Sequence, residues 1–293
     1  MAEPLHALSV DVEDWFQVLN MATTIDRAQW NTLALRCGDS TKRLLDLFEK
    51  RNARATFFFL GWIAERLPQL VCDVRDAGHE IGSHGYDHRC LDDLGEAGFV
   101  TDLVRTEQAL AAAAGVRPTT FRACTWSITA RTPWAPKVLV EHGYLLDSSI
   151  FPIRHPDYGV PSAPREPYVL TVGDRELLEL PPLTWSVLGR RVPVGGGGYL
   201  RLFPLAFLRA GLRATARAGW PGCVYLHPWE VDPEQPRQDL RGLRGFRHYV
   251  NLGKTLGKLD RLLSEFRFVG LNEAMRGREA RLARVTAGEV LGF

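Results

Sequence analysis

Three carboxylates stand within four positions at the end of the chain's first apolar run. Residues 9–16 read SVDVEDWF, so Asp11, Glu13 and Asp14 come directly after the apolar run 5–10. Like charges this close repel each other, and a solvated turn, a helix N-terminus or a bound cation can compensate them. Taken alone, the triplet favours the turn or helix N-terminus. With a metal ion, one carboxylate would be a ligand and another would stay free as a general base.

Two histidines four residues apart form the second candidate group. His84 and His88, in SHGYDH, follow the short apolar run HEIGSH. A helical turn would place both imidazoles on one face. Two histidines and a carboxylate make the three-ligand set of a catalytic divalent metal, with open positions for water and substrate. Solvated or capping histidines are the commoner explanation of such a pair alone, but the acidic triplet beside it favours a metal centre.

The elements that must position these residues are predicted to alternate between strand and helix. The runs ARATFFFLG, HEIGSH, TTFRA, GCVYLH and FRFVGL read as strands, with helical patterns between them, one of them capped by Ser40. This alternation predicts an α/β fold, namely a distorted or incomplete (β/α) barrel of about seven strands, in a single domain over residues 1–293. Eight prolines and the run Gly195–Gly198 in residues 151–199 predict a long irregular insertion.

Several polar residues fall where the predicted strands end. They are Asp11, His84, Arg122, Asp147 and His227. In (β/α) barrels the reactive residues lie at the C-terminal ends of the strands. These side chains are therefore expected to meet in one site, although a surface ion pair for Arg122 and a structural role for His227 are the ordinary alternatives.

Composition excludes several classes of function. The net charge of +2 argues against nucleic acid or an acidic membrane surface as a partner. The absence of a long apolar stretch argues against a transmembrane segment. Because the first residues lack a basic region followed by a long apolar one, we expect a cytoplasmic protein. The odd number of scattered cysteines predicts reduced thiols. Nothing in the sequence indicates the oligomeric state.

The motifs, taken in order, resemble those of a known enzyme family. The set SVDVED, ATFFFLG, GHEIGSHGYDH, FRACTWSIT, DSSIFP and YLHPWE resembles the NodB-homology polysaccharide deacetylases of carbohydrate esterase family 4. It is most similar to the branch associated with exopolysaccharide biosynthesis and exosortase systems, whose C-terminal extension carries HPWE and FRHY segments. The resemblance covers nearly the whole chain. It implies a NodB-homology fold with a family-specific insertion and extension at about residues 151–280.

The resemblance implies a metal site and a base. Asp11 matches the catalytic base, and His84 and His88 match the metal-binding histidines. The metal carboxylate stays open between two residues. The Asp-x-Asp arrangement of related peptidoglycan deacetylases selects Glu13, whereas residue type selects Asp14, which we slightly prefer.

Three further residues match the catalytic machinery of the family. Arg122 matches the arginine that orients the base and keeps it ionised. His227 matches the general acid that protonates the leaving amine. Asp147 lies in the segment whose acidic residue tunes that histidine.

Two tryptophans and one cysteine bear on substrate and metal. Trp126 and Trp229 are candidate walls for a sugar ring, with core packing an equal alternative. Cys124 stands where relatives carry the proline of an Arg-x-Pro motif, so a thiol is expected near the metal and the base.

The resemblance implies a function as well as a fold. It implies a metal-dependent hydrolase, with zinc as the expected ion, that removes N-acetyl groups from amino sugars of a polysaccharide or a lipid-linked glycan precursor. Two alternatives are a cyclic amide or imide hydrolase of the same fold and a non-catalytic carbohydrate-binding protein. The presence of Asp11, His84 and His227 together argues against the second of these.

Overall fold

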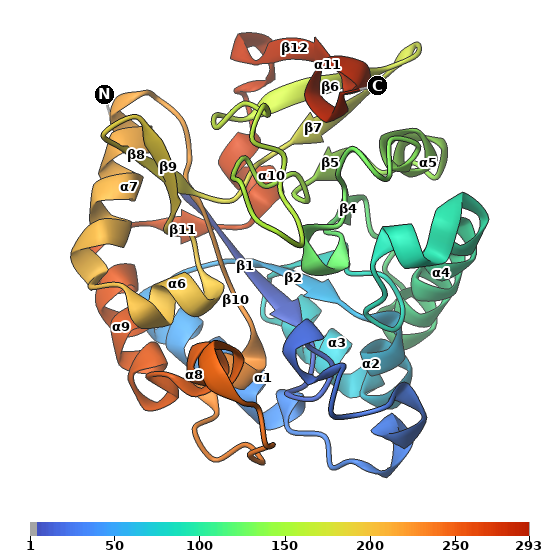
Figure 1. Ribbon diagram of the computed structural model, residues 1–293, viewed down its shortest axis with the longest axis vertical. Coiled ribbons are helices and arrows are strands. Elements are labelled where there is room, and N and C mark those ends of the chain that lie inside the picture. Colours follow the sequence, from blue (N-terminus) through green and yellow to red (C-terminus); the bar gives the residue numbers. More distant parts are fainter. Residues whose placement is uncertain (1–4, 293) are drawn as a thin grey trace.

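A largely parallel sheet organises the computed structural model, which describes residues 5–292 (Figure 1). The strand order is β10-β1-β2-β3-β4-β5-β7-β6-β12, and β11 also pairs with β1. The α/β prediction is confirmed. The strands are β1 (His6–Val12), β2 (Thr56–Phe59), β3 (Glu80–Ser83), β4 (Thr120–Phe121), β5 (Leu146–Asp147), β6 (Tyr168–Val172), β7 (Arg175–Glu179), β8 (Thr184–Val187), β9 (Arg190–Pro193), β10 (Cys223–Leu226), β11 (Phe268–Val269) and β12 (Ala283–Thr286).

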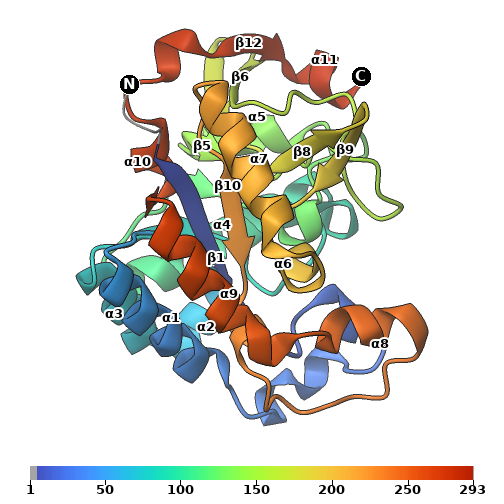
Figure 2. The same ribbon diagram turned by 90° about the vertical axis from the view of Figure 1, so that its left-hand side faces the viewer.

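The central strands are buried along their whole length. Every residue of β1, β2 and β10 is buried, as expected of parallel strands covered on both faces. Helices surround the sheet (Figures 1 and 2). They are α1 (Cys37–Arg51), α2 (Gly61–Arg66), α3 (Pro68–Asp76), α4 (Leu91–Ala114), α5 (Ala135–Glu141), α6 (Gly197–Leu202), α7 (Leu205–Arg217), α8 (Gly242–Tyr249), α9 (Leu252–Glu265), α10 (Leu271–Met275) and α11 (Ala287–Leu291), with 3-10 turns η1 (Leu19–Met21), η2 (Arg27–Thr32), η3 (Cys124–Trp126), η4 (Pro228–Val231) and η5 (Glu279–Arg281).

The sheet curls toward a barrel without a continuous hydrogen-bonded ring. Parallel ladders run from β10 through β1 to β5 and on to β7. Between β7 and β10, the described residues form no regular ladder. Two isolated bridges stand there instead, one from Pro182 to Cys223 and one from Gly196 to Tyr225. The chain after β7 therefore fills the gap that a regular strand would close.

The insertion is more regular than its composition predicts. Residues 151–199 contain β6 and β7, which form an antiparallel hairpin, and β8 and β9, which form a second one. The prediction of an irregular insertion is wrong for this part. Gly173 and Asp174 separate β6 from β7, and Gly173 has a φ of 62°. A glycine turn between two apolar runs is a hairpin signal that the proline count obscured.

The N-terminus of α1 differs from its prediction. The helix begins at Cys37, and Ser40 lies buried inside it rather than at its cap. Instead, the Asp14 carboxylate accepts hydrogen bonds from the backbone N–H groups of Arg36 and Cys37, at 2.7 and 2.9 Å. A side chain from 22 residues upstream thus satisfies the helix start.

Two other features of the described residues bear on earlier expectations. All five cysteines are free thiols, as predicted. No helix within residues 5–292 is long and apolar enough to cross a membrane.

Candidate active site

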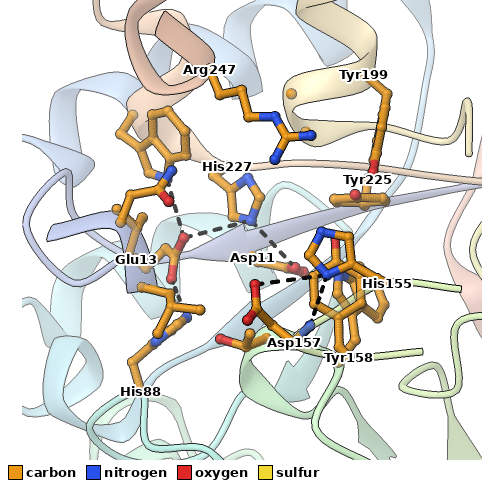
Figure 3. Close-up of a pocket in the computed structure, with 18 of the residues that line it drawn as sticks. Asp11, Glu13, His88, His155, Asp157, Tyr158, Tyr199, Tyr225, His227 and Arg247 are labelled. Carbon is orange, nitrogen blue, oxygen red and sulfur yellow. Dashed lines mark hydrogen bonds and ion pairs between the residues drawn. The ribbon is translucent and has the colours of Figure 1, made fainter. Parts of the chain in front are cut away.

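The C-terminal ends of parallel strands converge on one pocket (Figure 3). Asp11 stands near the end of β1, His84 follows β3 and His227 follows β10. Of the five residues expected to meet at the strand ends, these three line the pocket. The predicted site residues that line the pocket are Asp11, Glu13, His84, His88, Trp126, His227 and Trp229.

Asp11 is held by a buried arginine. Arg122 follows β4 and is fully buried, and its Nη1 lies 2.8 Å from Asp11 Oδ1. The same nitrogen donates to Ser9 Oγ at 2.6 Å, and Nη2 donates to Ser148 Oγ at 2.8 Å. The guanidinium is therefore fixed from three sides, and its position excludes the surface ion pair. The guanidinium therefore fixes the orientation of the Asp11 carboxylate.

Glu13 extends into the same pocket. Its Oε2 lies 2.7 Å from His88 Nε2, and its Oε1 accepts a hydrogen bond from Trp229 Nε1 at 3.1 Å. Burial alone would raise the pKa of Glu13, but the imidazoles of His88, His227 and His84 outweigh burial and lower it to about 2. The carboxylate is thus ionised across the physiological range.

The residues around Glu13 fit a divalent cation. Apart from the nearby His88 nitrogen, no polar group in residues 5–292 satisfies the buried Oε2 of Glu13. His84 Nδ1 lies 2.8 Å from the carbonyl oxygen of Arg122, which fixes the imidazole and leaves its Nε2 free, as in many metal-binding histidines. Burial lowers the pKa of His84 to about 4, so this ring is neutral at pH 7 and able to bind a metal.

Cys124 also lies beside the two histidines. One potential ligand atom each from His84, His88 and Cys124 lies within 4.8 Å of the others. The Cys124 thiol donates to the carbonyl oxygen of His84 at 2.8 Å. The expectation of a thiol near the histidines agrees with this placement, but burial raises the pKa of the thiol well above its ordinary value.

Asp14 lies outside this pocket. Besides the two N–H groups at the start of α1, its carboxylate accepts the N–H of Trp15 at 2.9 Å. Burial raises the pKa of Asp14 against the lowering effect of these hydrogen bonds. Of the two carboxylates considered for the metal, the structure therefore brings only Glu13 to the histidines, and the slight preference for Asp14 has no support in the geometry.

His227 has a different carboxylate partner from the one expected. Its Nδ1 lies 2.6 Å from Glu230 Oε1, and Glu230 Oε2 accepts from Arg201 Nε at 2.7 Å. His227 Nε2 faces the pocket, 3.8 Å from Asp11 Oδ2 and 3.5 Å from Glu13 Oε1. Burial lowers the pKa of His227, but Glu13, Glu230 and Asp11 outweigh burial and raise it to about 9.

Asp147 is buried elsewhere, against a second carboxyl group. It accepts a hydrogen bond from Ser149 Oγ at 2.5 Å, and Ile150 N–H donates to Glu179 Oε1 at 3.1 Å. Burial raises the pKa of Asp147 to about 6. Burial together with the charge of Asp147 raises the pKa of Glu179 well above its ordinary value. Asp147 does not line the pocket or contact His227. Its predicted role as the partner of His227 is therefore not supported by the geometry.

Comparisons with known proteins agree with this geometry. Residues 21–144 match the model of the family described as "Polysaccharide deacetylase", and residues 148–276 match "Domain of unknown function (DUF3473)". We call residues 21–144 the deacetylase domain, after the family that they match.

Relatives with assigned activities match parts of the chain. A peptidoglycan-N-acetylglucosamine deacetylase of Bacillus cereus is 37% identical over 82 residues, which are 28% of this chain and 30% of that protein. A peptidoglycan deacetylase of Helicobacter pylori is 30% identical over 132 residues, 45% of this chain and 41% of that protein. The matched segments span less than half the length of either relative.

A solved structure shares the whole fold. A Mycobacterium smegmatis protein assigned to the polysaccharide deacetylases superposes with a TM-score of 0.63 and 23% identity, over 97% of this chain and 94% of that one. The deacetylase domain and the segment after it therefore adopt together a fold that is already known.

The two tryptophans of the candidate site differ in their surroundings. Trp126 packs against Phe151 and Tyr225, with ring centroids 5.2 and 4.9 Å apart. Trp229 stacks on His248 at 4.5 Å while its indole N–H binds Glu13. Both side chains are buried and line the pocket, so packing and a place in the pocket wall occur together, and contact with a sugar ring stays a prediction.

Sequence reasoning missed several residues of the candidate site. Glu230 and Tyr225 were within the quoted motif YLHPWE, where their spacings of three and two residues from His227 are the signals that could have found them. No such signal marks the others, because they come from separate loops and helices. They are His155, Asp157, Tyr158, Tyr199, Arg201 and Arg247.

Proposed function

We propose that this chain is a metal-dependent hydrolase that removes N-acetyl groups from amino sugars of a glycan. One observation supports the proposal most directly. Asp11, which Arg122 holds, lies 3.8 Å from His227 Nε2. The carboxylate of Glu230 lies behind the imidazole of His227. A base and an acid on opposite sides of a pocket suit amide hydrolysis, because water must lose a proton and the leaving nitrogen must gain one.

The proposed metal site consists of Glu13, His84 and His88. Two histidines and one carboxylate are a common catalytic zinc set, and we therefore propose zinc. When bound, a divalent ion polarises a carbonyl oxygen and lowers the pKa of water. The approach of Glu13 Oε2 to His88 Nε2, at 2.7 Å, supports this assignment over Asp14, whose carboxylate turns to the start of α1.

The remaining roles follow from the contacts of each side chain. Asp11 removes the proton from the attacking water, and Arg122 orients Asp11 through its hydrogen bond. His227 is protonated at neutral pH and donates its Nε2 proton to the departing nitrogen. Glu230 holds His227 through Nδ1, so that Nε2 points to the substrate.

The proposed substrate is an N-acetylated glycan, including a lipid-linked precursor. The names of the matched relatives support N-acetylglucosamine as the sugar. The segments His227–Glu230 and Phe246–Tyr249 lie within the region matched by the second family model. Their resemblance to the exopolysaccharide-associated branch supports an exopolysaccharide as the source of the glycan.

Acetate release and metal content together test the proposal. Purified wild-type protein, with zinc supplied, should release acetate from chitooligosaccharides or bacterial glycan extracts. Asp11→Asn should lower the rate by about 100-fold or more and retain the metal, whereas His84→Ala should lose both activity and metal. Metal binding without acetate release from any glycan would contradict the deacetylase function, and wild-type protein that binds no divalent ion would contradict the metal site.

A further inference from the structure

An exposed apolar and basic surface lies beside the pocket mouth. It comprises residues 237–247, which include most of the helix α8, and Leu19 in the connection after β1. Arg244 Nη1 donates to Thr23 Oγ1 at 3.1 Å and so joins α8 to that loop. Figure 2 shows α8 at the edge of the molecule. Leu19 and Arg247 both line the pocket, and in Figure 3 Arg247 extends toward it.

The outward side of α8 is apolar where an ordinary surface helix would be polar. Leu243 and Phe246 are 77% and 56% exposed, and Leu19 is 44% exposed. Gly245 and His248 form the buried side of the helix. Surface helices normally direct their apolar residues to the core, so an exposed leucine and phenylalanine at i and i+3 indicate a surface that another phase or molecule covers.

This orientation is fixed by the protein beneath the helix. Arg201 Nη1 donates to the carbonyl oxygens of Arg247 and His248, at 2.9 and 2.6 Å. The ring of His248 stacks on Trp229 at 4.5 Å. Since α8 is anchored on its buried side, it cannot turn Leu243 and Phe246 inward without breaking these contacts.

The charge of the surface indicates what covers it. Residues 237–247, RQDLRGLRGFR, hold four arginines against one aspartate, although the whole chain has a net charge of only +2. Within the described residues, the only ion pair of these arginines joins Arg241 to Asp239 at 3.5 Å, and both side chains are more than 80% exposed. A basic cluster with exposed apolar side chains complements an anionic lipid surface, where arginines meet headgroups and apolar side chains enter the acyl boundary.

We propose that α8 and residue 19 dock the protein onto an anionic membrane surface, with the pocket mouth beside the bilayer. The proposal is independent of the deacetylase function, since docking requires no turnover. It departs from the expectation drawn from net charge, because residues 237–247 hold four arginines against one aspartate.

Vesicle flotation of the full chain tests the proposal. Wild-type protein should float with vesicles containing about one third phosphatidylglycerol, should not float with pure phosphatidylcholine, and should be released by high salt. Arg241→Gln/Arg244→Gln should bind on the order of thirtyfold more weakly, since each arginine near the surface contributes roughly fivefold. Leu243→Ser/Phe246→Ser should also lose binding.

A matched control uses the opposite end of the strands. Leu145, 63% exposed, precedes β5, and Arg267, also exposed, precedes β11. Leu145→Ser/Arg267→Gln should float like wild type, and the melting temperatures of all variants verify folding. The proposal would be overturned if the folded α8 variants floated like wild type, or if wild type bound both lipids equally. It would also be overturned if the protein did not float but self-associated, and Leu243→Ser/Phe246→Ser abolished that self-association.

Discussion

His227 Nδ1 lies 2.6 Å from Glu230 Oε1, and this contact decides which end of the imidazole faces the pocket. The carboxylate is buried and also accepts from Arg201, so its position is fixed on both sides. Burial would raise the pKa of Glu230, but the charges of Arg201 and His227 outweigh burial and lower it. An ionised Glu230 holds a proton on Nδ1 and directs Nε2 toward Asp11.

Replacing Glu230 by glutamine should therefore damage catalysis without removing the metal. We expect kcat to fall by about 100-fold or more, because the neutral amide can still accept a hydrogen bond from Nδ1 but no longer stabilises the charge of the imidazolium. Steady-state kinetics with zinc analysis would show kcat reduced while metal content stays at the wild-type level. Glu234→Gln, at an exposed carboxylate on the same segment, is the matched control and should leave kcat unchanged. A normal kcat in Glu230→Gln would eliminate this positioning role.

The two neighbouring carboxylates Glu13 and Asp14 should give opposite results. Glu13→Gln should abolish metal binding, since it removes the carboxylate beside His88. Asp14→Ala should keep the metal but destabilise the fold by about 0.5–2 kcal/mol, because it exposes the N–H groups at the start of α1. Metal analysis after dialysis and urea denaturation separate the two effects. Loss of metal in Asp14→Ala with metal retained in Glu13→Gln would reverse the assignment.

The positions of the reactive residues could be predicted because they depend on local features. Asp11 and His227 each follow an apolar run, and parallel strands bring their C-terminal ends to one edge. The partners of these residues depend on distant contacts. Asp14 rather than Glu13 turns to the start of α1, which lies more than twenty residues downstream. Glu230 is an exception, because it stands only three residues after His227, whereas Asp147 is directed to Ser149 and Glu179 instead.

The buried pair of Asp147 and Glu179 should make stability depend on pH. Both pKa values are raised in the folded protein, so the native state binds more protons than the unfolded state above pH ~4, the ordinary carboxyl range. Stability should therefore fall as pH rises from about 4 through 6 and beyond. Glu179→Gln should lessen this fall, because it removes one of the two carboxyl groups.

Melting temperatures across this pH range check the prediction. Glu176→Gln is the matched control, since Glu176 lies on the same strand but pairs with Arg284 at the surface. Its pH dependence should follow that of wild type. Parallel curves for wild type and Glu179→Gln would show that the pKa values of the pair do not differ between the folded and unfolded states.

The run Gly195–Gly198 allows the chain to approach the wall of the pocket. A Cβ atom at position 196 would lie 1.8 Å from the carbonyl oxygen of Tyr225, which is backbone and cannot move aside. At position 198 the nearest atom would be Arg201 Nη2, at 3.9 Å. Gly196 also bridges Tyr225, whose N–H donates to the carbonyl oxygen of Gly195. A side chain is therefore excluded by close contact at position 196, whereas position 198 has room for one.

Gly196→Ala should accordingly be destabilised by more than about 2 kcal/mol, since the clash forces the backbone apart. Because Tyr225 lines the pocket, KM for the glycan should rise in any of this variant that still folds. Gly198→Ala should be as stable as wild type or slightly more so, because alanine favours the helix α6. Urea denaturation of the two variants provides the comparison. Equal free energies of unfolding would mean that the segment shifts to accept a side chain, and close approach would then not explain the glycine at position 196.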